Sequence, residues 1–211
     1  MSTISSATAK TILTRLGFRV NTEARYKQGL QDFQAGWNLG AALAIDGLLG
    51  DYTSAALLLS EKRRAAGLGT ASANFSFVEF ACKCGGKYSV CRRINGEGLP
   101  NHNQHVLRSL LQSLEKMRST YYPNGMTVIS GYRCDAYNAS VGGASSSQHR
   151  YGAAADIVPV VDKDTLKTKR WFAGIGYQAS SDDVRHVDRR DLSGINPTKG
   201  STTSPTMWKY S

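Results

Sequence analysis

The feature that most constrains the fold is a change in hydrophobic periodicity near Gly67. Before it, apolar residues recur at helical spacing in residues 8–16, 24–36 and 53–66. After it, the runs MTVISGY, AADIVPVV and VRHVDRR are short, β-rich and bounded by Gly, Ser or Asp, and a single amphipathic stripe extends from Val106 to Met117. The sequence predicts a small all-α, three-helix unit followed by an α+β domain with a small antiparallel sheet.

The segment GLGTASAN, residues 67–74, separates the two patterns. Its residues are small and polar, a composition that buries little surface and bends freely. We therefore expect a helical module over residues 1–66, a linker over 67–74 and a second domain over 75–211. With 211 residues, 41% of them hydrophobic, the chain is long enough to bury a substantial core.

The charge balance favours an acidic partner. The formal net charge is +10, which suits association with nucleic acid, an anionic membrane or an acidic wall polymer. We expect no nucleic-acid binding, because the chain has no basic stripe interleaved with aromatic residues, no zinc-finger spacing and no helix-turn-helix pattern. The N-terminus lacks the apolar run of a secretory signal, and no stretch of roughly 18 apolar residues occurs. We expect a monomer made in the cytoplasm without a signal peptide and without membrane insertion.

The stretch LQDFQAGWNLGAALAIDGLLGDYTSAAL in the helical part resembles the peptidoglycan-binding module often attached to wall-degrading enzymes. The resemblance covers roughly residues 8–66 and implies that this part binds bacterial peptidoglycan. Much of the pattern is turn chemistry, so a purely structural three-helix bundle is the alternative. The matching positions are Phe33, Gln34, Asp46, Gly47, Gly50 and Thr53.

Candidate metal ligands occur in the second part. In SSSQHRYGAAAD, a glycine and three alanines separate His149 from Asp156, which opens the apolar run DIVPVV. A carboxylate that begins a buried strand needs a partner. His186 lies in the alternating stretch DDVRHVDRR, on the same strand face as Asp188. Two nitrogens and one oxygen, from His149, Asp156 and His186, suit a zinc ion whose fourth position stays open for water.

The pattern S-x-H-x-x-G-x-A-x-D, from Ser147 to Asp156, resembles the zinc signature of the D-alanyl-D-alanine metallopeptidases. That family includes carboxypeptidases, L-alanyl-D-glutamate endopeptidases and phage endolysins. The resemblance extends from about Phe75 to Asp191, and it includes the SGYR motif that ends at Arg133 and the later strand with His186. Three separated motifs thus occur in the order that the family shows.

The resemblance implies roles for particular residues. His149, Asp156 and His186 become the ligands of a Zn²⁺ cofactor. The family's general base is an acidic residue three positions before the last histidine, which here is Asp183. Arg133 is assigned to catalysis through substrate binding and transition-state support, because a guanidinium binds carboxylates bidentately.

Two further residues are candidates for the substrate-binding site, and they lie in the motifs just described. These residues are Ser147 and Tyr132.

The resemblance further implies a bacterial cell-wall hydrolase, similar to an endolysin, that cleaves an amide bond in the peptide stem or cross-link of peptidoglycan. Such an enzyme would act on the wall after release from the cytoplasm. Two alternatives stay open at this point. One is a carboxypeptidase that removes a terminal D-alanine, and the other is a non-catalytic wall-binding protein.

The four cysteines all lie in the second part, at positions 82, 84, 91 and 134. They suit two disulfides or a structural Cys₄ zinc site. We expect disulfides from the Cys82 and Cys84 pair to Cys91 and Cys134, since a bridge within the pair would close a very tight loop. The two remaining histidines, His102 and His105, are expected at a solvated helix end.

Overall fold

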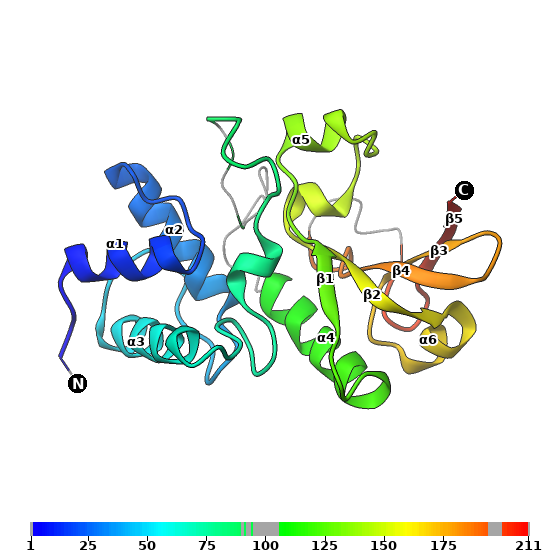
Figure 1. Cartoon of the computed structure of the whole chain (residues 1–211), viewed down its shortest axis with the longest axis horizontal. Coiled ribbons are helices and arrows are strands. Elements are labelled where there is room, and N and C mark those ends of the chain that lie inside the picture. The colour runs from blue at the N-terminus through cyan, green and yellow to red at the C-terminus, as the bar shows by residue number, and fades with distance from the viewer. Residues whose placement is uncertain (1, 90, 92–93, 95–105, 194–199, 211) are drawn as a thin grey trace.

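The structure is a computed structural model that describes residues 2–89, 91, 94, 106–193 and 200–210. His102 and His105, expected at a helix end, lie outside these residues. Figure 1 shows three N-terminal helices on one side of the molecule, a sheet on the other, and α4 between them. The helices are α1 Ser6–Arg15, α2 Glu23–Gly36, α3 Asp51–Ala65, η1 Phe77–Phe80, α4 Val106–Tyr121, α5 Asp135–Ser140, η2 Gln148–Tyr151 and α6 Lys163–Lys169.

The turn before α3 is organised around one buried side chain, Gln34 of α2. Its amide nitrogen donates to Asp46 Oδ1, at 2.9 Å, and to Thr53 Oγ1, at 3.1 Å. Its amide oxygen accepts from the backbone N–H of Gly47, at 2.9 Å. Gly47 has φ +72°, a conformation that favours glycine. Gln34, Asp46, Gly47 and Thr53, four positions of the pattern that resembles the peptidoglycan-binding module, thus form one polar network. This network satisfies the buried amide of Gln34.

The sheet contains five described strands in the order β1-β2-β4-β3-β5. The first three pairings are antiparallel, whereas β5 runs parallel to β3, so the sheet is mixed rather than antiparallel as expected. The chain leaves β4 at the end where β3 begins, and β5 starts from that same end. The strands are β1 Thr127–Ser130, β2 Ala154–Asp162, β3 Gly174–Gln178, β4 Asp183–Asp188 and β5 Thr206–Tyr210.

One hydrophobic core joins both parts of the chain. The ring of Phe77 lies 5.1 Å from that of Phe18 and 5.3 Å from that of Phe33, between the centroids. The α4 helix packs its apolar stripe against the sheet on the same core. The α+β arrangement expected for the second part is therefore present, with α4 covering one sheet face and leaving the other face for a site. The core residues of α4 are Leu107, Leu110, Leu111, Leu114 and Met117.

The segment 67–74 is packed rather than loose. Thr70 and Ala71 are buried. The Ser60 hydroxyl donates to the carbonyl of Thr70 at 2.9 Å. The backbone N–H of Asn38 donates to the carbonyl of Ala71 at 2.7 Å. The expectation that this segment buries little is wrong, because its small side chains allow close packing between helices. The division of the chain into two domains stays a prediction.

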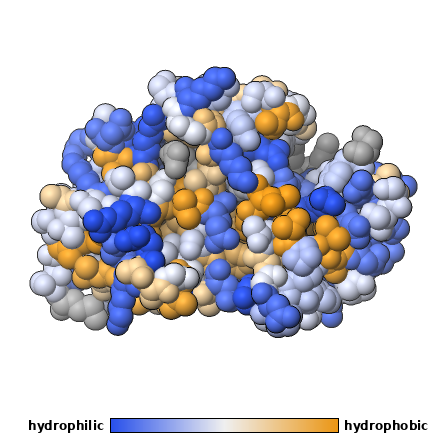
Figure 2. Space-filling model, in the orientation of Figure 1, coloured by the Kyte–Doolittle hydropathy of each residue, from blue (hydrophilic) through white to orange (hydrophobic). Residues whose placement is uncertain are grey.

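None of the described helices is both long enough and apolar enough to cross a membrane. On the face drawn in Figure 2, hydrophilic side chains surround smaller apolar groups.

Candidate metal centre

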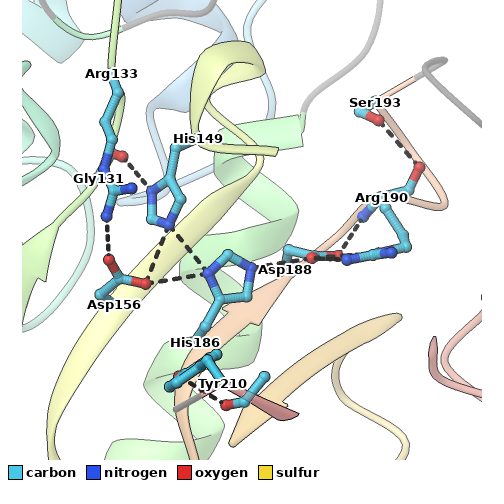
Figure 3. A network of polar contacts seen from close by, with 10 residues as sticks. Gly131, Arg133, His149, Asp156, His186, Asp188, Arg190, Ser193 and Tyr210 are labelled. Atoms are coloured by element: carbon cyan, nitrogen blue, oxygen red, sulfur yellow. Dashed lines mark hydrogen bonds and ion pairs between the residues drawn. The ribbon is translucent and has the colours of Figure 1, made fainter. Parts of the chain in front are cut away.

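Three side chains converge on the open face of the sheet (Figure 3). His149 lies on η2, and Asp156 of β2 is directly paired with His186 of β4. His149 Nε2 lies 3.1 Å from Asp156 Oδ1 and 3.0 Å from His186 Nδ1, and the latter is 3.0 Å from Asp156 Oδ1. The three atoms therefore form a nearly equilateral triangle.

The small residues between His149 and Asp156 explain this convergence. Gly152 ends η2 with φ 66°, a left-handed conformation that reverses the chain without strain. The three alanines that follow it are almost completely buried. Larger side chains there would push β2 away from η2. The sequence expectation that these residues bring the aspartate back beside the histidine agrees with this geometry.

The donor set fits a zinc ion. Tetrahedral zinc with bonds of about 2.0–2.1 Å separates its ligand atoms by roughly 3.3 Å, close to the edges of the observed triangle. Two imidazole nitrogens and one carboxylate oxygen are ligands that catalytic zinc sites use, with one position left open. The same three residues form one of two groups of side chains in the described part of the chain that could hold a metal ion.

Hydrogen bonds from the opposite ring nitrogens fix the two imidazoles. His149 Nδ1 lies 2.6 Å from the carbonyl oxygen of Gly131, and His186 Nε2 lies 3.1 Å from Asp188 Oδ2. Because a carbonyl and a carboxylate only accept, these nitrogens carry the protons. In the neutral form of each ring, the lone pair is therefore on the nitrogen that belongs to the ligand triangle, as a metal requires.

Asp188 is a supporting residue whose role sequence reasoning missed. Its side chain is fully buried, and it accepts from Arg190 Nη2 at 2.7 Å as well as from His186. Burial opposes ionisation, but the hydrogen bonds from His186 and Arg190 lower the pKa of Asp188 to about 2. Space is tight, because a Cβ on Gly174 would lie 2.2 Å from this carboxylate. The alternation that places Asp188 on the face of His186 was the available signal.

The protonation of the two histidines differs. Burial lowers the pKa of His149 and so favours its neutral ring. Burial acts in the same direction on His186, but hydrogen bonds to Asp156 and Asp188 raise the pKa of His186 to about 9. Burial likewise opposes the charge on Asp156, whereas the bonds from both histidines lower its pKa. The centre therefore holds a firmly ionised carboxylate between two rings.

The family model of peptidase M15 matches residues 73–188, a segment that contains all three residues of the triangle. The chain belongs to the peptidase M15 family. Membership implies a metallopeptidase, which agrees with the potential metal ligands His149, Asp156 and His186. No curated protein matches the chain. The matched segment of this M15 peptidase begins after α3, so the family says nothing about the three N-terminal helices.

A cleft of about 720 Å³ opens above the triangle of this M15 peptidase. Ser147 lines it, and the contact of this residue with substrate stays a prediction. Tyr132 is 1% exposed and packs among the cysteines, so the expectation that it binds substrate does not fit its position. Trp208 and Tyr210 of β5 line the cleft instead. They escaped the sequence analysis, although the alternation in MWKY was a weak signal for a strand.

Arg133 lines the cleft, but its guanidinium is already engaged. It forms an ion pair with Asp156 Oδ2, and its Nε donates to the hydroxyl of Ser130 at 2.9 Å. This geometry orients the second oxygen of Asp156. Arg185, which the sequence analysis did not single out, is an exposed cation on the wall of the same cleft.

Asp183 begins β4, where an irregularity in strand pairing affects its direction. Gly176 pairs with His186, and the next residue of β3, Tyr177, pairs with Val184, so Arg185 is an extra residue. Val184 therefore faces the core, and alternation places Asp183 on the sheet face of His186. Asp183 is nevertheless not among the residues that line the cleft.

The carboxylate next to Asp183 has a different partner. Asp182 forms an ion pair with Lys163 at 2.9 Å, beside α6. Asp188 is fully buried between His186 and Arg190. Asp182 and Asp188 are thus both engaged in ion pairs. Asp183 is half-buried and takes part in neither of these two pairs.

Proposed function

We propose that this M15 peptidase is a zinc-dependent hydrolase of bacterial cell-wall peptides, similar to an endolysin. The observation that carries the proposal is the triangle of His149 Nε2, Asp156 Oδ1 and His186 Nδ1, with edges of 3.0–3.1 Å, at an open cleft. In this proposal the protein acts as a monomer on the peptidoglycan, after its release from the cytoplasm.

The chemistry needs few residues beyond the ligands. His149, Asp156 and His186 would hold a zinc ion, which would supply Lewis-acid chemistry: polarisation of a carbonyl and a lowered pKa, about 7, for a bound water. Asp183 takes the proton of the attacking water, from its position on the sheet face of His186. Arg133 keeps Asp156 in its orientation. Arg185 attracts the carboxylates of wall peptides into the cleft.

The N-terminal helices support wall binding in this proposal. A second cleft of about 730 Å³ lies beside α3 and is lined mainly by apolar side chains. Trp37 and Leu59 contribute to it, together with Tyr52, whose surface is 81% exposed. Aromatic and apolar side chains around a concave surface are typical of ligand sites. A module that holds the enzyme on an insoluble polymer raises the effective concentration of substrate.

One observation favours the alternative of a carboxypeptidase that removes terminal D-alanine. Arg185 offers a cation at the cleft that suits the free carboxylate of a chain end. Both activities use the same centre and differ only in the bond that is cleaved.

The test is digestion of purified peptidoglycan followed by mass spectrometry of the soluble products. New amino termini within stem peptides or cross-links support an endopeptidase, and release of free D-alanine alone supports the carboxypeptidase. Chelation should abolish either activity, and added zinc should restore it. The matched control is a His149→Ala, His186→Ala double variant, which should release nothing. Intact peptidoglycan after incubation with zinc-loaded protein would overturn the proposal.

A further inference from the structure

Four cysteines from two distant segments meet in one buried cluster outside the catalytic cleft. Three of them come from the turn-rich segment that follows η1, and the fourth directly follows Arg133. Their sulfur atoms all lie within 4.8 Å of one another. No disulfide joins any two of these four cysteines, so the expected disulfides are not present in the structure. The residues are Cys82, Cys84, Cys91 and Cys134, which are 3%, 9%, 0% and 0% exposed.

The segment that carries three of these cysteines is held from outside by Arg19, whose Nη1 donates to the carbonyls of Tyr88, Ser89 and Cys91 at 3.0–3.3 Å. Among the residues that the structure describes, the four cysteines form a hydrophobic cluster separate from the main core, together with Tyr88, Tyr132 and Tyr137. Residues 81–89 contain turns and bends but no helix or strand. A cross-link between its cysteines would restrict the conformations of such a segment further.

We propose that the four cysteines bind a second, structural zinc ion. Tetrahedral zinc with Zn–S bonds of about 2.3 Å places its sulfur ligands roughly 3.8 Å apart, which agrees with four sulfurs inside one small volume. The backbone N–H of Cys134 donates to Cys82 Sγ at 3.3 Å, a contact that stabilises negative charge on sulfur. Because the protein supplies all four ligands, no position is left for water or substrate, so the site is structural.

The backbone after Cys84 suits such a site. Gly85 and Gly86 have φ +64° and +83°, with open space at both Cβ positions. Two successive left-handed residues turn the chain sharply, which side chains would disfavour. The N–H of Lys87 donates to the carbonyl of Cys84 at 3.0 Å and closes this turn. After this turn the chain continues to Cys91, which lies beside the other three cysteines.

The arrangement favours a metal over two disulfides. A disulfide joins two specific sulfurs at about 2.05 Å. Two disulfides do not require the sulfurs of one pair to lie close to those of the other. Here all four sulfurs lie within 4.8 Å of one another, and no disulfide joins any two of them. A shared central ion explains why all four gather in one place.

The site has a consequence for the catalytic centre, because Cys134 ends the segment that supports it. Gly131 accepts the hydrogen bond of His149, and Arg133 pairs with Asp156. The N–H of Tyr132 donates to the carbonyl of Phe80 at 2.9 Å, close to Cys82 in the chain. A zinc ion between Cys134 and the three other cysteines would hold this segment in place.

The first test counts thiols and metal in the full-length protein, purified without reductant. Alkylation in denaturant with a chelator should modify four cysteines, whereas two disulfides would leave none to react. Elemental analysis should find two zinc ions per chain. The His149→Ala, His186→Ala variant lacks the catalytic ligands and should retain one. This variant separates the second site from the proposed function, since it is made inactive by design.

A second test identifies the ligands. Co²⁺ loaded into the double-histidine variant should show the intense sulfur-to-cobalt charge-transfer absorption of thiolate ligands, which a centre of nitrogen and oxygen ligands cannot give. Cys84→Ser, made in the chain that keeps both histidines, should weaken this absorption because one of four thiolate ligands is lost, while its histidine centre still binds one zinc ion. If the serine variant does not fold, two measurements still distinguish a zinc site from disulfides. They are the thiol count of the unmodified protein and the cobalt spectrum of the double-histidine variant. Two disulfides, or a double-histidine variant without metal, would overturn the inference.

Discussion

The buried carboxylate of Asp188 lies 3.1 Å from Nε2 of His186, on the side of the ring that faces away from the ligand triangle. Such a carboxylate fixes the orientation of a ligating imidazole and makes it more basic. We predict that Asp188→Asn lowers zinc affinity about 10–100-fold, because the amide keeps the shape but not the charge. The measurement is competition with a chelator of known affinity.

Asp182→Asn is the matched control for this prediction. Asp182 lies on the same segment but pairs with Lys163, away from the triangle. Its replacement should leave zinc affinity unchanged. Equal zinc affinities for Asp188→Asn and the parent would show that Asp188 does not support His186.

The second prediction concerns pH. In the metal-free protein the pKa of His186 is raised to about 9, so the ring carries an extra proton at neutral pH. That proton must leave before Nδ1 can bind zinc. Apparent zinc affinity should therefore fall as pH drops below this pKa, by about tenfold per unit, and level off above it. The measurement is the zinc dissociation constant across this pH range.

Asp188→Asn is also informative for the pH profile. It removes one of the two carboxylates that raise the pKa of His186. The affinity should then level off at a lower pH than in the parent. Zinc affinity that does not vary with pH below the pKa would contradict the prediction for the parent protein.

The return of Asp156 beside His149 was accessible from sequence because it depends on local residues, whereas the assignment of His186, 37 positions from His149, as the third ligand depended on the family resemblance. Small side chains around Gly152 permit the close return of β2, and strand alternation places His186 and Asp188 on one face. The engagement of Arg133 by Asp156 was not accessible. It depends on two side chains 23 positions apart, whose distance only the folded sheet determines.

The arrangement of the sheet and of the whole molecule was less predictable. The parallel β5 depends on where a long connection returns, and no local pattern encodes that. The extra residue Arg185 in β4 puts Asp183 on the same sheet face as His186. A regular alternation would put Asp183 on the opposite face. The small residues of segment 67–74 resembled a linker, yet they pack closely because the neighbouring helices leave little space.

The third prediction addresses the shared core. Phe33 of α2 is fully buried and lies 5.3 Å from Phe77, between ring centroids. Phe33→Ala should cost about 3–5 kcal/mol of unfolding free energy. Because the core is continuous, calorimetry should show one transition that moves as a whole. Tyr52→Ala is the control, since Tyr52 is 81% exposed and should leave the transition in place. Two transitions, only one of them shifted, would instead support independent domains.

The fourth prediction separates two cleft arginines. Arg133 pairs with Asp156, so Arg133→Lys loses the fork that holds this ligand and should weaken zinc binding. Arg185 is exposed on the cleft wall, and Arg185→Gln should raise KM for acidic wall peptides without changing zinc affinity. Zinc titrations and steady-state kinetics on both variants provide the comparison. The assignment fails if Arg185→Gln loses zinc or if Arg133→Lys retains its full zinc affinity.

The last prediction concerns Asp183 as the general base. Residues three positions apart in a regular strand face opposite sides of the sheet. The extra residue in β4 instead places Asp183 on the sheet face of His186. Asp183→Asn keeps the size of the side chain but removes its basicity, so zinc should remain bound while kcat falls by about 10²- to 10⁴-fold. KM should change little, because the loss arises after substrate binds. Asp182→Asn is the control, since Asp182 is occupied by Lys163. Near-normal kcat in Asp183→Asn with full zinc content would reject the role, and a collapse in Asp182→Asn alone would transfer it to that residue.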